Sequence, residues 1–404
     1  MKNSKYSSSQ LSLFDPDVKV RHATVVAKVC NESQYVSCSE CAFLQNCGGL
    51  EQYAAWGCSS HCVTCTRKQC DFTCFSRLPQ MVERMQEVRG FLNRNYQKLK
   101  IPAANTLPVY IPVVYNQSCR LRTLDIPMVA IPFHRALKLT SDGHYRPLST
   151  NAKELREEFK ISADSKVLIT GVAFDRYLER YWQYAEHHGT ARKLSDLDVF
   201  GMTVPNFSHF TDVTQPHILY NNRRAQITAE CMSQQGLSVI PHVNASMPRD
   251  WQAWTDLFRQ QPQINMFSKE FQTGLSDPDL AERAINELAS LQDKVGRELH
   301  PILFGAAPFI PQVRSLFREF TIVDSRPFMS TVMRRKFVLR DDGTRSWVRN
   351  LTERGEDLDD LLAHNVKNYA LWIAMMASKS AASTKTPSRT LPQMIEPEIF
   401  ELQP

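Results

Sequence analysis

The sequence predicts an α/β fold that follows a small cysteine-rich metal module. Two features of the 404-residue chain predict it. Nine of the 11 cysteines lie between Cys30 and Cys74, and short apolar strands alternate with amphipathic helices from about residue 106. Such alternation is typical of a mostly parallel sheet covered by helices. With 43% hydrophobic residues, the chain has enough apolar material for a real core, which excludes disorder along its whole length.

The first segment, residues 1–29, is polar and then mixed, and we expect it to be flexible. Its start lacks the apolar stretch of a secretory signal, and no apolar run in the chain reaches the ~18 residues of a membrane span. We therefore expect a cytoplasmic protein with no membrane partner. Thiols stay reduced in that compartment, where clustered cysteines bind metal more often than they form disulfides.

The cysteine-rich module is expected over residues 30–77. Thiolates two or three residues apart can grip one metal from a tight turn, and a second turn completes the site. Nine thiols allow two four-cysteine sites with Cys30 left over, although the sequence does not fix the division and His61 could replace one cysteine. The predicted metal ligands are Cys38, Cys41, Cys47, Cys58, Cys62, Cys65, Cys70 and Cys74.

The spacing of these cysteines favours iron–sulfur over zinc. Only Cys38/Cys41 and Cys62/Cys65 have the Cys-x2-Cys spacing of zinc knuckles, and the remaining gaps are irregular. One or two [4Fe–4S] clusters are therefore the first expectation, with zinc as the alternative. A disulfide-rich or merely reduced-thiol segment is the third possibility.

Two parts of the cysteine segment resemble radical-SAM enzymes. Cys38-x2-Cys41-x5-Cys47-Gly48-Gly49 resembles their auxiliary-cluster segment, and Cys58-x3-Cys62-x2-Cys65 resembles the signature whose cluster binds S-adenosylmethionine. Two departures make S-adenosylmethionine the lesser expectation. Thr64 stands where that family usually has an aromatic residue, and the motif precedes the first predicted strand instead of following it.

A linking segment, residues 78–105, connects the module to the next domain. Leu78, Met81, Met85, Val88 and Leu92 recur at three- and four-residue steps. This spacing predicts an amphipathic helix over 78–99 that packs the module against the domain.

Residues 106–330 are expected to form a TIM-barrel-like domain. Eight strands are the number for a closed barrel. The first connection has no obvious helix, so an irregular or open barrel and a doubly wound open sheet stay as alternatives. The strands are expected at Val109–Val114, Pro127–Pro132, Lys166–Val172, Asp198–Val204, Leu237–Val243, Ile264–Ser268, Leu299–Phe304 and Phe320–Asp324, with helices at 151–159, 175–187, 217–235, 249–260, 278–295 and 311–318.

Polar residues at the carboxyl ends of these strands are the candidate site, because ligands of parallel α/β folds bind there. The candidate catalytic residues are Asn206, His242, Asn244, Glu270 and Asp324, and the candidate cofactor-binding residues are Arg223, Arg224 and Arg326. Together they suit acid–base work or anion binding. Several of them have a structural alternative: a turn residue at Asn206, a core histidine at His242, an Asp324–Arg326 ion pair, and a solvated helix face at Arg223 and Arg224.

The last part, residues 331–378, is expected to form a basic hairpin and a C-terminal helix. The cations are Arg334, Arg335, Lys336, Arg340, Arg345 and Arg349. Asp341-Asp342-Gly343-Thr344 predicts the turn of a hairpin over 333–349, and a helix follows over 357–378. The tail, residues 379–404, is rich in Ser, Thr, Pro and Lys and is expected to be disordered.

Between about residues 165 and 330 the chain resembles DUF4417, a bacterial and phage family of uncharacterised proteins. The similarity lies in Gly171-Val172 with Leu178-Glu179-Arg180, Val204-Pro205-Asn206-Phe207-Ser208, Tyr220-Asn221-Asn222-Arg223-Arg224, Pro241-His242-Val243-Asn244 with Arg249-Asp250-Trp251, and Phe271-Gln272-Thr273-Gly274. The resemblance implies an architecture and an origin in mobile elements. It implies no reaction.

Three functions follow as hypotheses. The first is an iron–sulfur enzyme of the barrel type with its site at the mouth and an unknown substrate. The second is a nucleic-acid-binding accessory protein of plasmids or phages, in which the cysteine module is structural and residues 334–349 contact phosphates. The net charge of +6 is too small to argue for nucleic acid alone. The third is a protein-interaction factor that uses the C-terminal helix and tail.

Overall fold

A computed structural model describes residues 73, 78–91, 97–103, 107–116, 120–141, 145–185, 189–209, 215–353 and 355–378. The eight predicted ligand cysteines, the first segment and the C-terminal tail lie outside these residues. So do Cys30, His61 and Cys119. The metal prediction for the cysteine-rich module is therefore untested by the described structure.

Two four-stranded parallel sheets form the centre of the described structure. One has the order β1 (Tyr110–Pro112), β10 (Thr321–Asp324), β9 (His300–Phe304) and β8 (Met266–Glu270). The other has the order β2 (Met128–Pro132), β5 (Lys166–Thr170), β6 (Gly201–Thr203) and β7 (Val239–Ile240). Single parallel bridges join the sheets at both edges, from Val113 to Ala130 and from His242 to Ser268. The predicted α/β class with mostly parallel strands is confirmed.

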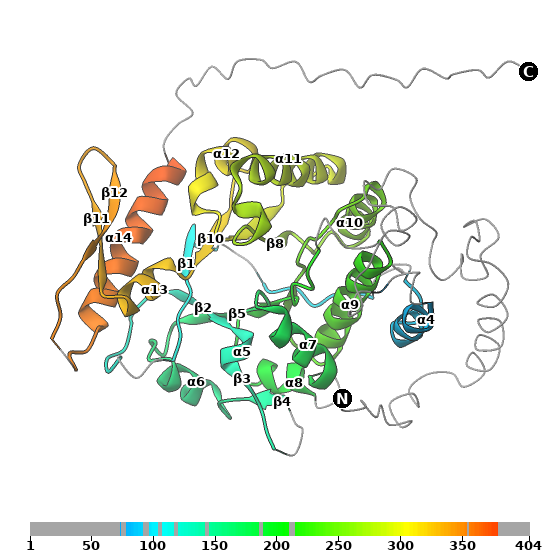
Figure 1. Ribbon diagram of the computed structural model, residues 1–404, viewed down its shortest axis with the longest axis horizontal. Helices are drawn as coiled ribbons and strands as arrows, with labels where there is room; N and C mark the ends of the chain where they lie inside the picture. Colours follow the sequence, from blue (N-terminus) through cyan, green and yellow to red (C-terminus); the bar gives the residue numbers. More distant parts are fainter. Residues whose placement is uncertain are drawn as a thin grey trace, which may run out of the picture.

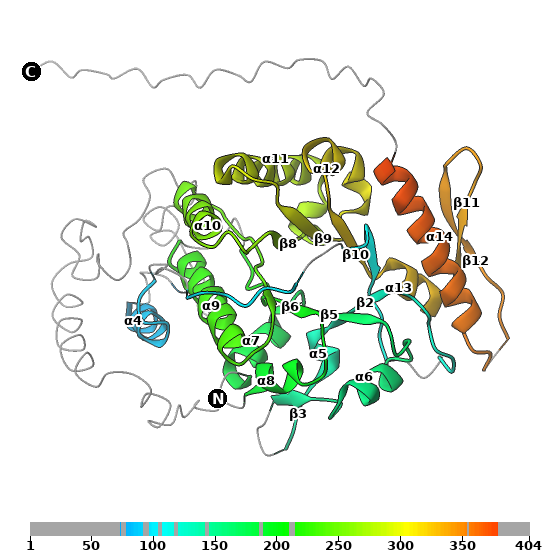
Figure 2. The ribbon, with the colours of Figure 1, turned by 180° about the vertical axis from the view of Figure 1, so that it is seen from behind.

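Helices lie around these strands (Figures 1 and 2). They follow the strands in sequence, as expected for parallel strands joined by crossover connections. Their bounds are α5 (Phe133–Ala136), α6 (Ala152–Glu158), α7 (Asp175–Tyr184), α8 (Thr190–Ser195), α9 (Gln215–Gln234), α10 (Pro248–Gln260), α11 (Pro278–Val295), α12 (Ile310–Leu316) and α13 (Arg326–Val332), with 3-10 turns η5 (Gly274–Ser276) and η6 (Ala307–Phe309).

Side chains alternate along the strands between two apolar clusters, as the period of two requires. Both sheets contribute to one inner cluster, which holds Leu168, Ile240, Met266, Ile302 and Val323. The residues between them face the larger cluster that the helices cover, and these include Val167, Ile169, Val239, Phe267 and Ile322. The inner faces of the two sheets therefore share one core.

Several helices match the bounds that periodicity predicted. The helix expected over 278–295 is α11, and capping residues mark both its ends. Asp277 accepts hydrogen bonds from the backbone N–H groups of Asp279 and Leu280, both at 3.1 Å, and Gly296 ends the helix at a φ of 78°. The predicted hairpin is β11 (Arg335–Leu339) with β12 (Arg345–Arg349), and the last helix is α14 (Asp359–Ser378).

The linking helix is shorter than the predicted span 78–99, and that prediction was wrong. The helix α4 covers Leu78–Glu87 only. Arg89 and Gly90 follow with positive φ values of 59° and 94°, and the Gly90 N–H donates to the Met85 carbonyl at 2.7 Å. This glycine closes the helix in the left-handed conformation that helix ends favour.

A small hairpin, β3 (Leu137–Leu139) with β4 (Tyr145–Pro147), was not predicted, and neither were α5, α8 and α13. All of these elements are too short for hydrophobic periodicity to predict them. None of the helices in the described ranges is long and apolar enough to cross a membrane.

Candidate functional site

Side chains from three neighbouring strands meet at the carboxyl ends of β6, β7 and β8. Asn244 donates through Nδ2 to Oδ1 of Asn206 at 2.8 Å, and Lys269 donates through Nζ to Oδ1 of Asn244 at 3.0 Å. An ammonium group can only donate, so Asn244 must turn its oxygen to Lys269 and its amide to Asn206. Two of the five predicted catalytic residues are thus brought together with a lysine outside that set.

Gly171 brings Asn206 to this position. The backbone N–H of Asn206 donates to the Gly171 carbonyl at 3.0 Å, and the Gly171 N–H donates to Oγ1 of Thr203 at 2.7 Å. A Cβ at residue 171 would lie 2.4 Å from the backbone oxygen of Thr203. Only glycine allows the ends of β5 and β6 to approach this closely.

His242 lies beside this chain of contacts and is 3% exposed. Its Nδ1 is 3.0 Å from Oγ of Ser268, which in turn donates to the Pro241 carbonyl at 3.3 Å. Because the Ser268 proton is used in that bond, we assign the imidazole proton to Nδ1. The Nε2 lone pair has no hydrogen-bond partner among the described residues. Burial lowers the pKa of His242 well below its usual value, and Lys269 and His209 add to this, so the ring is neutral.

Lys269 is a half-buried amine without an ion pair. No carboxylate lies within 4.0 Å of its Nζ among the residues that the structure describes. Burial lowers the pKa of Lys269 to about 8, although the charges of Glu270 and Glu287 oppose that effect. The amine therefore changes charge close to neutral pH.

A second neutral histidine, His209, adjoins the group. Burial lowers its pKa to about 3, helped by Lys269 and His217 and opposed by a hydrogen bond with Asn222. Asn222 is itself fixed, since its Nδ2 donates to Oδ1 of Asp250 at 2.9 Å. We call Asn206, His209, His242, Asn244 and Lys269 the His–Lys cluster.

The cysteine-rich segment approaches the same region at its one described residue, Thr73. Thr73 is 1% exposed, and its backbone N–H donates to Nδ1 of His217 on α9 at 3.3 Å. In the sequence Thr73 lies between Cys70 and Cys74. The chain between two predicted metal ligands therefore contacts the helix whose His217 influences His209.

The two predicted catalytic carboxylates, Glu270 and Asp324, make other contacts. Glu270 accepts hydrogen bonds from the backbone N–H groups of Gln272 and Thr273, the second at 2.8 Å, and so closes its own turn. Asp324 accepts a hydrogen bond from the Tyr369 hydroxyl at 2.7 Å and another from the backbone N–H of Arg326 at 2.8 Å. Burial raises the pKa of Asp324. No hydrogen bond or ion pair between described residues joins either carboxylate to the His–Lys cluster.

The two arginines of α9 bind other parts of the protein. Arg223 donates to the Val88 carbonyl at 3.2 Å, and Arg224 forms an ion pair with Glu179 at 2.7 Å. The Arg224 guanidinium also lies 4.3 Å from the ring centre of Phe207. Since both arginines are at most 5% exposed, the alternative of a solvated helix face is wrong.

Lys269 and His209 were missing from the predicted site residues. The place of Lys269 at the end of a strand was a signal, but a lysine there usually extends into water. His209 follows Asn206 by three residues in the loop after β6, and that proximity was the one available clue. Their burial depends on α9, α10 and the strand ends packing together.

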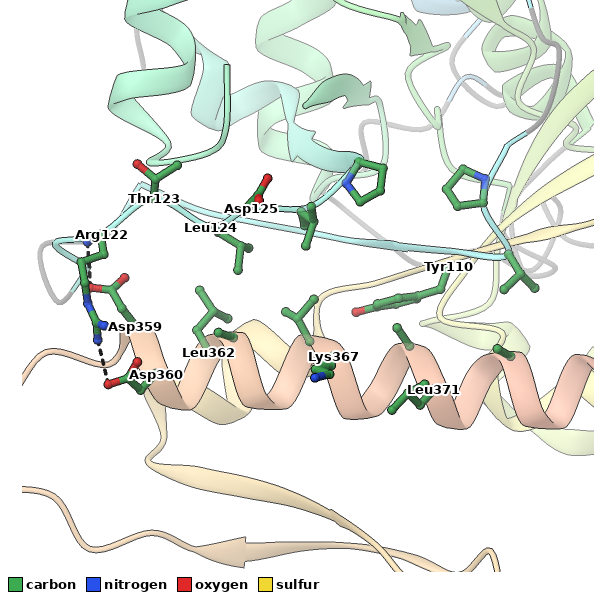
Figure 3. A pocket seen from close by; sticks show the side chains of 18 residues that line it. Tyr110, Arg122, Thr123, Leu124, Asp125, Asp359, Asp360, Leu362, Lys367 and Leu371 are labelled. Atoms are coloured by element: carbon green, nitrogen blue, oxygen red, sulfur yellow. Dashed lines mark hydrogen bonds and ion pairs between the residues drawn. The ribbon is translucent and has the colours of Figure 1, made fainter. Parts of the chain in front are cut away.

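A separate cavity of about 750 Å³ lies at the opposite, amino end of β1 and β2, against α14. Figure 3 shows Leu124, Leu362 and Leu371 beside it and Arg122 at one end. Arg122 is paired with Asp360 at 2.9 Å and with Asp357 at 3.2 Å. The lining is mainly apolar.

No model of a known protein family matches this chain, and no curated protein matches its sequence. The resemblance to uncharacterised phage and bacterial proteins therefore stays a prediction from the motifs alone.

Proposed function

We propose that this protein is a barrel-type enzyme that performs acid–base chemistry at the His–Lys cluster. The observation that carries the proposal is the buried, neutral His242, whose Nε2 has no partner among the described residues, next to an amine with a pKa of about 8. Unsatisfied buried polar atoms are costly, and they persist where a ligand uses them. Perturbed pKa values in a cluster are typical of catalytic groups.

A closed barrel is the architecture that we propose for the two sheets. Its support is the pairing at both seams: the Val114 N–H donates to the Ala130 carbonyl at 2.9 Å, and the Val243 N–H donates to the Ser268 carbonyl at 2.9 Å. Together with the strand order within each sheet, these contacts support a ring of eight parallel strands. Such a ring gathers every carboxyl end around one opening, where barrel enzymes hold their active sites.

The chemistry of the cluster suggests the kind of substrate. The neutral His242 can accept a proton, while the Lys269 ammonium and the Asn206 amide can face a developing negative charge on oxygen. Neighbouring strands are about 4.8 Å apart, so groups on β7 and β8 can act on adjacent atoms of one molecule. We infer a small polar substrate with a carbonyl or carboxylate oxygen and an acidic proton nearby.

The test is conversion of small molecules by the full chain, purified anaerobically with its metals. The protein is incubated with a metabolite extract, and substrates are found as compounds that disappear. We expect Lys269→Met to abolish the conversion and Lys166→Met, an exposed lysine at the amino end of β5, to leave it unchanged. Equal conversion by Lys269→Met and the unaltered protein would remove the proposal, as would an extract that stays unchanged.

The cysteine-rich module is proposed to hold one or two [4Fe–4S] clusters beside this site. The support is the cysteine spacing together with the Thr73–His217 contact. We expect anaerobically purified protein to contain iron and acid-labile sulfide, and Cys41→Ser with Cys65→Ser to lose most of both. Cys231→Ser, at a partly buried cysteine beyond the module, is the matched control. Stoichiometric zinc in place of iron would contradict the assignment.

A further inference from the structure

The cavity beside α14 lies where the layer of helices around the strands is incomplete. The connection from β1 to β2, residues 113–127, contains no helix among its described residues, whereas every later connection between the parallel strands contains at least one. The space beside α14 therefore stays open (Figure 3), and we call this cavity the α14 groove. It lies at the amino ends of β1 and β2, away from the His–Lys cluster at the carboxyl ends of other strands.

The walls of the α14 groove are mainly apolar. Leu124 lies on the strand side, and Leu362 and Val366 lie on α14; each is at most 7% exposed. Figure 3 shows Leu124 and Leu362 directed toward each other across the groove. Leu371, further along α14, is 54% exposed. An apolar ligand in the groove would remove this surface from water, which is favourable.

The dimensions of the groove suit one narrow chain. It follows α14 from Asp359 to Ala374, a distance of about 22 Å at a helical rise of about 1.5 Å per residue. A volume of about 750 Å³ over that length corresponds to a cross-section of about 34 Å². A helix, about 10 Å across with its side chains, needs more than twice that area. An extended peptide is narrower, but its backbone N–H and C=O groups would lack partners on mainly apolar walls. A hydrocarbon chain meets both conditions.

Two polar groups in the groove are available to a ligand. Lys367 of α14 is exposed, and no carboxylate lies within 4.0 Å of its Nζ among the described residues. Tyr110 of β1 is 6% exposed, and its hydroxyl has no hydrogen-bond partner in the described part of the chain. Figure 3 shows the Tyr110 ring between β1 and α14, with the hydroxyl toward the part of α14 that carries Lys367. A buried donor without a partner is costly, and a ligand that accepts its hydrogen bond removes that cost.

The other charged groups of the lining are paired or directed elsewhere. Arg122 pairs with Asp360 at 2.9 Å, and Asp359 accepts a hydrogen bond from the backbone N–H of Arg122 at 2.9 Å. Figure 3 shows the Asp125 carboxylate directed away from α14. Among the described lining residues, Lys367 therefore supplies the charge that a ligand can pair with, and it favours an anionic head group.

We propose that the α14 groove binds a free fatty acid. Its hydrocarbon chain lies between Leu124 and Leu362, and its carboxylate pairs with Lys367 and accepts a hydrogen bond from the Tyr110 hydroxyl. A pocket of several hundred Å³ with apolar walls and a few polar groups is typical of small-molecule sites. The proposal is independent of the chemistry at the His–Lys cluster, since no residue of that cluster lines the groove.

Calorimetric titration of the full chain with saturated fatty acids of eight to fourteen carbons tests the apolar part. Each methylene that the groove covers should tighten binding up to about fourfold, until the chain fills the groove. Ala363→Trp with Ala370→Trp places two rings in the groove and should weaken binding about tenfold or more. Ala163→Trp, at an exposed alanine in the turn before β5, is the control and should leave the affinity unchanged.

The methyl ester of the same acid tests the head group. The unaltered protein should bind the acid about threefold more tightly than the ester, because an exposed ion pair contributes modestly. Lys367→Met should bind both equally, and Lys166→Met, at an exposed lysine outside the groove, should keep the difference. Tyr110→Phe should weaken both by about fivefold, because the carbonyl oxygen of each accepts the hydroxyl proton.

Thermal melting without ligand shows whether each variant folds, and the comparison of acid with ester in Lys367→Met decides the proposal even where the tryptophan variant unfolds. Absence of binding by the unaltered protein would overturn the proposal, as would a folded tryptophan variant that binds equally well. An affinity that does not rise with chain length, or tighter binding to phosphatidylcholine vesicles than to any free acid, would also overturn it.

Discussion

Lys269→Met is expected to stabilise the protein by about 2 kcal/mol at pH 7 while removing its activity. The pKa of Lys269 is lowered from 10.5 to about 8, and each unit corresponds to about 1.4 kcal/mol. The lost hydrogen bond to Asn244 returns about 1 kcal/mol of that gain. Between pH 8 and 10.5 the unfolded chain binds more protons than the folded chain, so the stability of the unaltered protein rises with pH there.

Urea unfolding at pH 7 and pH 10 checks this expectation. The unaltered protein should gain stability between the two values relative to Lys269→Met, which lacks the titrating amine. Lys166→Met is the control for the general effect of replacing a lysine by methionine. A variant that is less stable than the unaltered protein at pH 7, with the same dependence on pH, would show that Lys269 is a structural residue. A residue that costs stability fits a functional role.

Acid is expected to unfold the protein by charging histidines that the fold keeps neutral. Burial lowers the pKa of His209 to about 3 and of His134 and His217 to about 4, and it lowers that of His242 still more strongly from its usual value. Below pH 6.5 these histidines bind protons in the unfolded chain but stay unprotonated in the folded chain. Stability is therefore full above about pH 6.5 and falls as pH drops toward 4. The loss should reach several kcal/mol by pH 5.

Urea unfolding at pH 7, 6 and 5 measures the slope. His242→Gln should reduce it by about one proton, whatever the variant does to stability at pH 7, and the comparison cancels other acid-sensitive groups. An unchanged slope would mean that His242 can be protonated inside the fold. That result would contradict the lowered pKa that keeps the resting imidazole neutral.

Strong local periodicity accounts for the parts of the fold that the sequence predicted well. The apolar stripe of α11, between Asp277 and Gly296, defines that helix without knowledge of its neighbours. The predicted span of the linking helix was wrong because the apolar spacing continues through Leu92. The helix ends earlier, where Arg89 and Gly90 have positive φ values. A glycine inside a periodic run is a stop signal that competes with the pattern.

The candidate site was predictable only in part. Asn206 and Asn244 end neighbouring strands, so placing them together needed only the parallel order of the sheet. Asp324 could not be placed this way, because its partner is Tyr369 on a helix 45 residues later. The isolation of His242 Nε2 and the burial of Lys269 depend on rotamers and on long-range packing, which no local pattern encodes.

The motifs that carry the family resemblance converge on this site. Gly171, Asn206 and the pair His242 and Asn244 belong to three separate motifs in the sequence, and in the structure they lie at adjoining strand ends. Asp250, in another of these motifs, holds Asn222 next to His209.

A measurement of the pKa of Lys269 tests the proposed chemistry most directly. Competitive acylation of the folded protein over a range of pH, read by peptide mass spectrometry, reports the titration of this one amine, with exposed lysines of the same chain as references. We predict half-maximal reactivity of Lys269 near pH 8. A midpoint at the ordinary lysine value of 10.5 would contradict the acid–base assignment.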